Sequence, residues 1–376
     1  MTIAVNIGFT AGSFPSSTND LLFEYFSALA ASHSKQQFIF IVDKDFDEKN
    51  IRAKNCIAIV AGSVTTNPIL LQYRLNFTIP AILRKHKADV FVSYGNCSLR
   101  SKLPQCMLVN HLSFLLHPEL YSNSWLRFYK KNTPKFTAHA TTIVASSAFL
   151  KQQLIDNYKK DAAAIHVVNY GADEIYSPQG WQEKDAVKEN YSQGLEYFLY
   201  AGPIDPKQNL VNLLKAFSFF KKRQKSNMQL IIASASAATD KAFIKSLGSF
   251  KYRNEVKVLD KLPEPTLAKI TGSAYALVYP SVYENFAASI PAAQQSAVPV
   301  IAGNGQAIKE IYGDTVLYTN STDFNDIADK MMLLFKDENK RNELIEKSRQ
   351  QAALYDRTAN MAIIWEAIEK STGVSF

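Results

Sequence analysis

The sequence has little cysteine and little histidine for its 376 residues. Its three cysteines, Cys56, Cys97 and Cys106, are far apart and form no C-x-x-C pair. An odd and unpatterned set argues against a disulfide framework and indicates reduced thiols in a cytoplasm. The six histidines do not cluster at metal-ligand spacing, so the sequence predicts no structural zinc and no metal cofactor.

Long apolar runs are also missing. No stretch approaches the roughly 18 uninterrupted apolar residues that a membrane helix needs. The first residues, MTIAVNIGF, lack a basic lead and predict a strand rather than a signal peptide. With only 14 glycines, long flexible linkers are not expected. A hydrophobic fraction of 47% is ordinary for a soluble globular protein, and the length favours two domains.

Positive charge is in excess, with a net charge of +8 that is unevenly distributed. The segment from Arg84 to Lys160 contains twelve lysines and arginines but only three acidic residues. One interpretation is a solvated basic surface. The other is attraction to an anionic phospholipid leaflet or to a phosphate-bearing substrate. Nucleic acid is not predicted, because no recognised binding motif accompanies the charge.

Short β-branched runs alternate with amphipathic stretches along the whole chain. Helices are predicted at residues 19–32, 148–160 and 209–224, the last with Asn209 as its cap, and the tail from Ser321 to Lys370 is almost all helical. Strands are predicted at residues 3–9, 37–42, 56–62, 89–93, 106–111, 141–146 and 164–169, and again at 195–202, 229–234, 255–260, 274–280 and 298–303.

This alternation predicts two doubly wound α/β domains with parallel sheets. The polar stretch at residues 177–194 separates the two series of strands and is interpreted as the connection between domains. We therefore expect domains at residues 1–180 and 181–357. In such sheets, ligands bind outside the carboxyl ends of the strands, at a topological switch point, and two facing sheets form a cleft.

Five segments in order give a more specific signal. They are 110–154 (NHLSFLLHPEL…SSAFLKQQL), 166–178 (HVVNYGADEIYSP), 200–217 (YAGPIDPKQNLVNLLKAF), 278–286 (VYPSVYENF) and 297–318 (AVPVIAGNGQAIKEIYGDTVLY). Together they resemble the retaining glycosyltransferases of family 4, also called group 1, from about residue 88 onward. The resemblance implies a GT-B fold, with two Rossmann-like domains facing across a cleft. The N-terminal domain would receive the acceptor, and the C-terminal domain would bind a nucleotide-sugar donor without metal. The helix within residues 358–376 would pack back on the first domain.

Glu284 matches the first acid of the family's paired-glutamate motif, which holds the transferred sugar through its hydroxyl groups. The alternative is an ordinary acid in a surface loop. The second acid of the motif, which grips the ribose, falls on Ala292. Losing that charge-assisted hydrogen bond costs about 1.5–3 kcal/mol, which weakens a donor site without abolishing it. Gln295, one turn later, is a candidate substitute.

The resemblance also implies donor-binding residues around Glu284. Where the family often has glycine, this chain has Asn285 and Ala287, but a helix beginning near Ser289, with that serine as its cap, still offers backbone N–H groups to a diphosphate. The predicted phosphate cradle therefore consists of Phe286, Ala287, Ala288 and Ser289, and Asn285 beside it is also predicted to bind the donor.

Gly202 ends the strand that precedes the family's diphosphate-binding basic residues. The arginine of that motif is replaced by Pro203, and Gln208 stands near the lysine position. Lys207 is the predicted diphosphate cation, and the alternative is an exposed lysine in a loop. Gly12 matches the phosphate-facing glycine of the first domain only loosely.

On the acceptor side, the family's His-Asp pair falls on Asn110 and His111. We predict that these two residues and Glu284 are catalytic, with His111 supplying the imidazole from a shifted position. The alternative leaves the site without an imidazole. His117 is expected to cap or pack locally.

The predicted function is therefore retaining, metal-independent transfer of a hexosyl unit from a UDP- or GDP-sugar to a glycan or lipid-linked acceptor in polysaccharide biosynthesis. We expect a cytoplasmic protein with peripheral contact to the anionic inner membrane face and no nucleic-acid partner. The substitutions at positions 110, 203, 208 and 292 leave open a degenerate GT-B protein that binds a sugar or partner without catalysis. A GT-B epimerase or phosphorylase fits less well, because no cofactor-lysine motif supports a phosphorylase and the motifs between the domains fit a transferase better.

Overall fold

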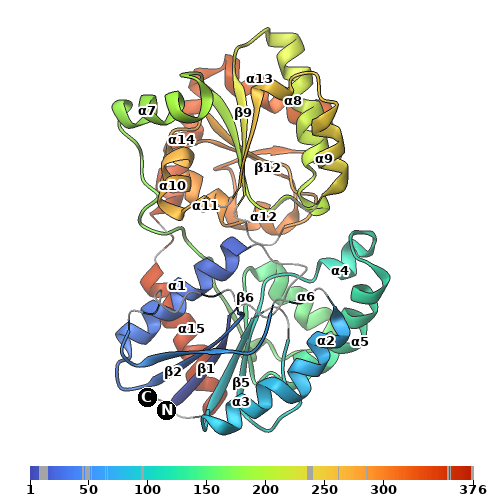
Figure 1. Ribbon diagram of the computed structural model, residues 1–376, viewed down its shortest axis with the longest axis vertical. Coiled ribbons are helices and arrows are strands. Elements are labelled where there is room, and N and C mark those ends of the chain that lie inside the picture. The colour runs from blue at the N-terminus through green and yellow to red at the C-terminus, as the bar shows by residue number, and fades with distance from the viewer. Residues whose placement is uncertain are drawn as a thin grey trace. The chain divides into compact units, whose positions relative to one another are not determined.

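The computed structural model describes residues 1–7, 16–44, 46, 51, 53–63, 65, 67–94, 97–234, 240–260, 262–284, 287–353, 355 and 357–373, with only the backbone for 16–21. It contains two compact units (Figure 1). The first unit comprises residues 1–14, 18–169 and 357–376, and the second comprises 15–17 and 170–356. The acceptor and donor roles of these units, with the bounds given above, stay predictions.

The first unit is built on a parallel sheet of seven strands within the described residues, in the order β3-β2-β1-β4-β5-β6-β7. Its elements are β1 (Thr2–Asn6), α1 (Ser16–Ser32), β2 (Gln37–Val42), β3 (Cys56–Val60), α2 (Pro68–Tyr73), the π-helix η2 (Arg74–Thr78), α3 (Ile79–Lys85), β4 (Val90–Tyr94), β5 (Gln105–Val109), α4 (Ser113–Leu116), the 3-10 helix η3 (Pro118–Leu120), α5 (Asn123–His139), β6 (Thr142–Ala145), α6 (Ala148–Tyr158), η4 (Ala162–Ala164), β7 (Ile165–Val167) and α15 (Arg357–Thr372).

Helices cover both faces of this sheet (Figure 1). One face packs against α2, α3, α5 and α6 in a single apolar cluster. On the other face, α1 and α15 lie together, with the rings of His33 and Trp365 stacked 3.6 Å apart. The Thr142 hydroxyl donates to the Ala367 carbonyl over 2.8 Å, so α15 is joined directly to β6.

The second unit holds a parallel sheet of six strands among its described residues, in the order β10-β9-β8-β11-β12-β13. Its elements are α7 (Trp181–Ser192), β8 (Tyr197–Ala201), η5 (Pro206–Gln208), α8 (Leu210–Gln224), β9 (Gln229–Ser234), α9 (Lys241–Gly248), η6 (Arg253–Glu255), β10 (Val256–Asp260), α10 (Glu264–Gly272), β11 (Ala276–Tyr279), α11 (Ser289–Gln295), β12 (Val300–Gly303), α12 (Gln306–Tyr312), β13 (Leu317–Thr319), α13 (Phe324–Lys336) and α14 (Glu338–Ala352). Helices α8, α9 and α13 lie on one side of the sheet and α7, α10, α11 and α14 on the other (Figure 1).

All twelve predicted strands are present, and the alternating pattern gives the parallel sheets as expected. The interpretation of residues 177–194 as a connection is wrong, because most of that stretch forms α7, which packs on α10 with Val187 buried. The stretch is polar because most side chains of α7 are exposed to solvent. The chain instead passes between the units at residues 169 and 170.

Both sheets share one topological feature. The chain starts in the middle of each sheet, builds outward on one side and then returns to build the other side, so the strand order reverses between β1 and β4 and between β8 and β11. At such a switch point, the loops after the two central strands diverge and leave a crevice for a ligand.

Candidate active site

The carboxyl ends of β8 and β11 bring most of the predicted donor residues together. Gly202 and Lys207 lie in the loop after β8, and Glu284 and Ser289 lie after β11. The two loops are joined by hydrogen bonds: the Val282 N–H donates to the Lys207 carbonyl over 3.2 Å, and the Ser289 hydroxyl donates to the carbonyl of Ala201. These residues therefore share one edge of the second sheet, at its switch point.

Glu284 is half-buried, and its carboxylate is contacted by a tyrosine from β11. The Tyr279 hydroxyl donates to Glu284 Oε2 over 3.4 Å. Burial, and secondarily the Glu284 charge, raises the pKa of Tyr279 well above its ordinary value. The phenol therefore stays protonated and remains a donor, which orients the carboxylate.

Tyr279 is itself held in place by Tyr200 of β8. The two rings stack with centroids 5.5 Å apart and an interplanar angle of 15°. The Tyr200 hydroxyl donates to the Pro203 carbonyl over 2.6 Å, and burial raises the pKa of Tyr200 well above its usual range. Pro203, at the arginine position of the family motif, is buried and provides only this backbone acceptor.

Gly202 is needed for this stacked pair. A Cβ at Gly202 would lie 2.7 Å from the Tyr200 hydroxyl and 3.2 Å from a Tyr279 ring carbon. Its φ of 159° also disfavours a side chain. The glycine therefore permits a close approach of the loop to the tyrosines.

Lys207 lies on the short 3-10 helix η5 and is half-buried. The Asp205 carboxylate accepts its backbone N–H over 2.8 Å and begins the turn. Burial is the main cause that raises the pKa of Asp205, with the nearby Lys207 charge acting in the opposite direction. Gln208, near the family's lysine position, is buried and carries no charge.

Helix α11 begins at Ser289, but the predicted capping role of that serine is wrong. Ala288 occupies the cap position without a side-chain hydrogen bond, and the Ser289 hydroxyl binds Ala201 on β8 instead. Ala287 is buried. Asn285 and Phe286 lie outside the described residues, so the phosphate cradle stays a prediction.

The predicted cap at Asn209 is confirmed in position, but its side chain does not bind the helix. Asn209 precedes α8, but it has φ 62° and makes no side-chain cap bond. Its amide donates to the carbonyls of Pro280 and Ser321. It therefore links the loop after β8 to the loops after β11 and β13.

Ala292 points away from solvent into a small apolar cluster. It is 4% exposed and packs with Tyr176, Ala268 and Ala172. Gln295, one turn later, donates its amide N–H groups to the carbonyls of Asp173 and Tyr176 over 2.7 and 2.8 Å. This side of α11 therefore holds residues 172–176, and the Gln295 amide nitrogen is already used there.

In the first unit, Asn110 and His111 follow β5, beside the switch point. The Asn110 side-chain amide donates to the Tyr94 hydroxyl over 2.9 Å, and the Asn110 backbone carbonyl accepts from the Ser146 hydroxyl over 3.3 Å. His111 is 9% exposed, with its Nδ1 3.1 Å from the Ser113 hydroxyl. These contacts fix both side chains at the carboxyl edge of the first sheet.

Two further predictions concern the same unit. His117 interacts locally, with its Nδ1 3.0 Å from Glu119 Oε1. Gly12 lies outside the described residues. Within the described part of the chain, no group of three or more His, Cys, Asp or Glu side chains could hold a metal ion. Among the helices described, none is both long and apolar enough to cross a bilayer.

Sequence reasoning missed Tyr200, Tyr279 and Gly303, and it missed the bonds from Asn209 to the neighbouring loops. A Cβ on Gly303 would overlap the carbonyl oxygen of Ser281, so this glycine lets the end of β12 approach the loop that carries Glu284. The position of the two tyrosines in the sequence could have indicated them. Each lies within the last two residues of a central strand, directly before a predicted site loop.

Comparison with known proteins shows that the second unit, which contains this edge of the sheet, resembles a known family. Residues 182–351 match the model of the glycosyl transferases group 1. The chain carries a group 1 glycosyltransferase domain. That domain covers most of the second unit and contains Gly202, Lys207 and Glu284.

Relatives extend the similarity beyond this domain. The chain is 24% identical to the O-antigen chain mannosyltransferase B of Escherichia coli over 261 residues, covering 69% of this chain and 68% of that protein. It is 25% identical to the O-antigen chain mannosyltransferase RfbU of Salmonella typhimurium over 243 residues, covering 62% and 64%. The family and these relatives make the protein a glycosyltransferase, and therefore a transferase enzyme.

Solved structures share the whole architecture. WaaG, a glycosyltransferase involved in lipopolysaccharide biosynthesis, aligns with a TM-score of 0.77 at 13% identity, over 99% of this chain and 100% of that chain. Anabaena Alr3699/HepE in complex with UDP-glucose aligns with a TM-score of 0.75 at 14% identity, over 97% and 98%. The fold is GT-B, with two parallel-sheet α/β domains.

Proposed function

We propose that the protein transfers a hexosyl unit, with retention of configuration and without a metal ion, from a nucleotide-diphospho-sugar to a glycan or lipid-linked acceptor. The observation that carries this proposal is the Glu284 carboxylate, oriented by Tyr279 at the switch point of the matched domain. A fixed carboxylate accepts hydrogen bonds from neighbouring sugar hydroxyls.

The residues at this edge have separate roles in the proposal. Glu284 holds the hexosyl group, and Lys207 with the backbone of residues 287–289 stabilises the diphosphate as the bond to the anomeric carbon breaks. The acceptor hydroxyl attacks from the face that the diphosphate leaves, and its proton passes to the departing diphosphate oxygen. Positioning and electrostatic stabilisation of the leaving group then supply most of the rate acceleration.

Asn110 and His111 are proposed to act on the acceptor side. Both are held at a strand end by neighbouring hydroxyl groups, which limits their freedom. The two mannosyltransferase relatives make a mannosyl donor the first candidate, and the UDP-glucose complex of the structural neighbour makes UDP-glucose the second. We propose that the acceptor belongs to a surface polysaccharide assembled on the cytoplasmic side of the inner membrane.

A donor panel tests this function. Thermal unfolding with UDP, GDP, ADP and their hexose conjugates, with and without magnesium, should show stabilisation by one nucleotide family independently of magnesium. Glu284→Gln keeps the shape of the side chain but loses its charge. We expect it to lower transfer by about tenfold to a hundredfold.

Glu346→Gln, an exposed acid on α14, is the matched control and should leave transfer unchanged. Equal activity of the Glu284→Gln and Glu346→Gln variants would overturn the assignment of Glu284. No stabilisation by any donor would instead favour the non-catalytic alternative, in which the domain binds a partner.

A further inference from the structure

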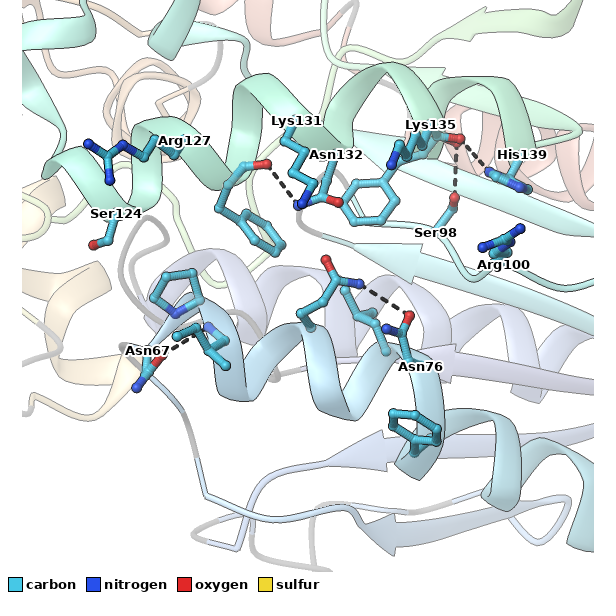
Figure 2. Close-up of a pocket in the computed structure, with 17 residues that line it drawn as sticks. Asn67, Asn76, Ser98, Arg100, Ser124, Arg127, Lys131, Asn132, Lys135 and His139 are labelled. Atoms are coloured by element: carbon cyan, nitrogen blue, oxygen red, sulfur yellow. Dashed lines mark hydrogen bonds between the residues drawn. The ribbon is translucent and has the colours of Figure 1, made fainter.

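A large groove lies in the first unit, apart from the residues assigned above. It has a volume of about 1340 Å³ and runs between α5 on one side and α2 with η2 on the other (Figure 2). Its lining residues all belong to the first unit. It contains four of the twelve basic residues between Arg84 and Lys160, namely Arg100, Arg127, Lys131 and Lys135, and the proposed transfer chemistry uses none of these four.

One wall of the groove is cationic. Arg127, Lys131, Lys135 and His139 recur every four residues along α5, so they line one face of that helix, and Arg100 joins them after β4 (Figure 2). The arginines and lysines are exposed, and none forms an ion pair with a described residue. No Asp or Glu is present among the lining residues described.

The opposite wall carries no charge and is partly apolar. Ile69 is 79% exposed and Phe77 is 61% exposed, and both line the groove. Leu70 and Tyr73 on the same segment are also exposed, and the Tyr73 and Phe77 rings lie 5.1 Å apart. Large apolar side chains gathered on a surface mark an interaction site, and short π-helices such as η2 are frequent at functional sites.

We propose that this groove binds one lipid that carries a phosphate or diphosphate headgroup. The headgroup contacts the cations of α5, and the hydrocarbon chain lies along Ile69 and Phe77. Charge complementarity argues for the anion, because the cationic wall lacks acidic partners. The uncharged wall argues for an amphiphile, since a free phosphate would leave Ile69 and Phe77 without a partner, and the aliphatic, exposed Ile69 suits a hydrocarbon chain better than a stacked base.

This inference rests on the proposed function, because it names the lipid as the carrier of the acceptor. A physical link exists within the first unit. The Phe114 ring of α4 stacks 5.2 Å from Tyr129 of α5, and the same short segment holds Ser113, which contacts His111. The helix that would hold the lipid phosphate therefore packs against the segment that positions a predicted acceptor-side residue.

Co-sedimentation with phosphatidylcholine vesicles, with and without a polyprenyl phosphate, tests the groove in the full chain. Binding is expected only with the phosphate lipid. Lys131→Gln with Lys135→Gln should lower the partition coefficient by roughly 10- to 30-fold, from the contribution of two lysines near an anionic surface. Lys85→Gln with Lys130→Gln removes the same charge from exposed lysines that do not line the groove, and should have a much smaller effect.

The apolar wall has its own test. Ile69→Ala with Phe77→Ala should weaken binding at high salt, where electrostatic attraction is screened and chain burial dominates. Thermal unfolding confirms that each variant is folded. If both double-lysine variants lost vesicle binding equally, the effect would come from general surface charge, and the assignment of the lipid to the groove would be wrong. Inorganic diphosphate that bound as tightly as the phosphate lipid would contradict a lipid ligand. Binding of a short RNA without binding of vesicles would contradict it as well.

The donor panel separates this inference from the proposed function. Loss of vesicle binding with donor stabilisation intact would refute only the lipid groove. Vesicle binding without any donor stabilisation would refute the transferase proposal and leave a lipid-binding protein.

Discussion

At the scale of single residues, the site depends on how a carboxylate is held. Glu284 was predicted from its sequence motif, but the residue that orients it was not. Tyr279 is the last residue of β11, and its side chain faces Tyr200 because β8 and β11 are neighbouring parallel strands. Sequence gives the identity of each residue. The pairing of two strands far apart in the chain decides which side chains meet.

Tyr279→Phe tests this orientation. It removes the hydroxyl that donates to Glu284 and keeps the ring stack, so we expect transfer to fall by about three- to tenfold, as for one modest hydrogen bond to a charged group. The measurement is kcat/KM for the donor identified by the panel.

Tyr200→Phe is the paired control, since its hydroxyl binds the Pro203 carbonyl and not Glu284. A larger loss of transfer for Tyr200→Phe than for Tyr279→Phe would show that the turn after β8, and not the carboxylate, limits the rate.

At the scale of elements, α11 shows that Ala292, at the place of the family's second acid, has a packing role of its own. Its side that carries Ala292 and Gln295 packs against residues 172–176, just after the chain enters the second unit. The Tyr176 hydroxyl donates to Glu264 of α10 over 2.6 Å, so a carboxylate is already close to this cluster. Ala292 therefore belongs to a packed interface between α11 and residues 172–176.

Ala292→Glu would restore the family's motif, and we expect it to destabilise the protein by about 1–3 kcal/mol, because a larger and charged side chain enters a packed cluster. Urea unfolding measures the change. Ala353→Glu, at an exposed position after α14, should stay within about 0.5 kcal/mol of the parent. A stable and more active Ala292→Glu variant would contradict the packing argument.

Elements were predicted where hydrophobic periodicity was strong and missed where it was weak. The strands of both sheets are apolar runs, and these gave the fold class. β13 has only three residues and α7 has mostly polar ones, so neither gave a clear pattern. Caps were the least predictable feature, because the side chains of Ser289 and Asn209 bind carbonyls outside their own helices, in β8 and in the loop after β11.

At the scale of the whole molecule, the first unit is assembled from two distant parts of the chain. Residues 357–376 belong to it, although the entire second unit intervenes. Ile364, Trp365, Ala367 and Ile368 of α15 are buried, and the Asn360 amide donates to the Asn169 carbonyl over 2.7 Å.

A chain that ends after residue 356 tests the role of α15. Each large apolar side chain that is buried contributes about 1.5–3 kcal/mol, so losing Ile364, Trp365 and Ile368 removes an amount comparable to the total stability of a domain. We expect the first unit to lose protection from hydrogen exchange while the second unit keeps it. Uniform protection across β4–β7 in the shortened chain would contradict this expectation.

The position of α15 also sets an order of events during synthesis. The strands of the first unit are made before the second unit, but the helix that packs on β4, β5, β6 and β7 is made after it. The second unit, almost continuous in sequence, can close while the first still lacks this cover. A nascent chain therefore exposes apolar surface of this sheet while the second unit is being translated, which favours binding by chaperones.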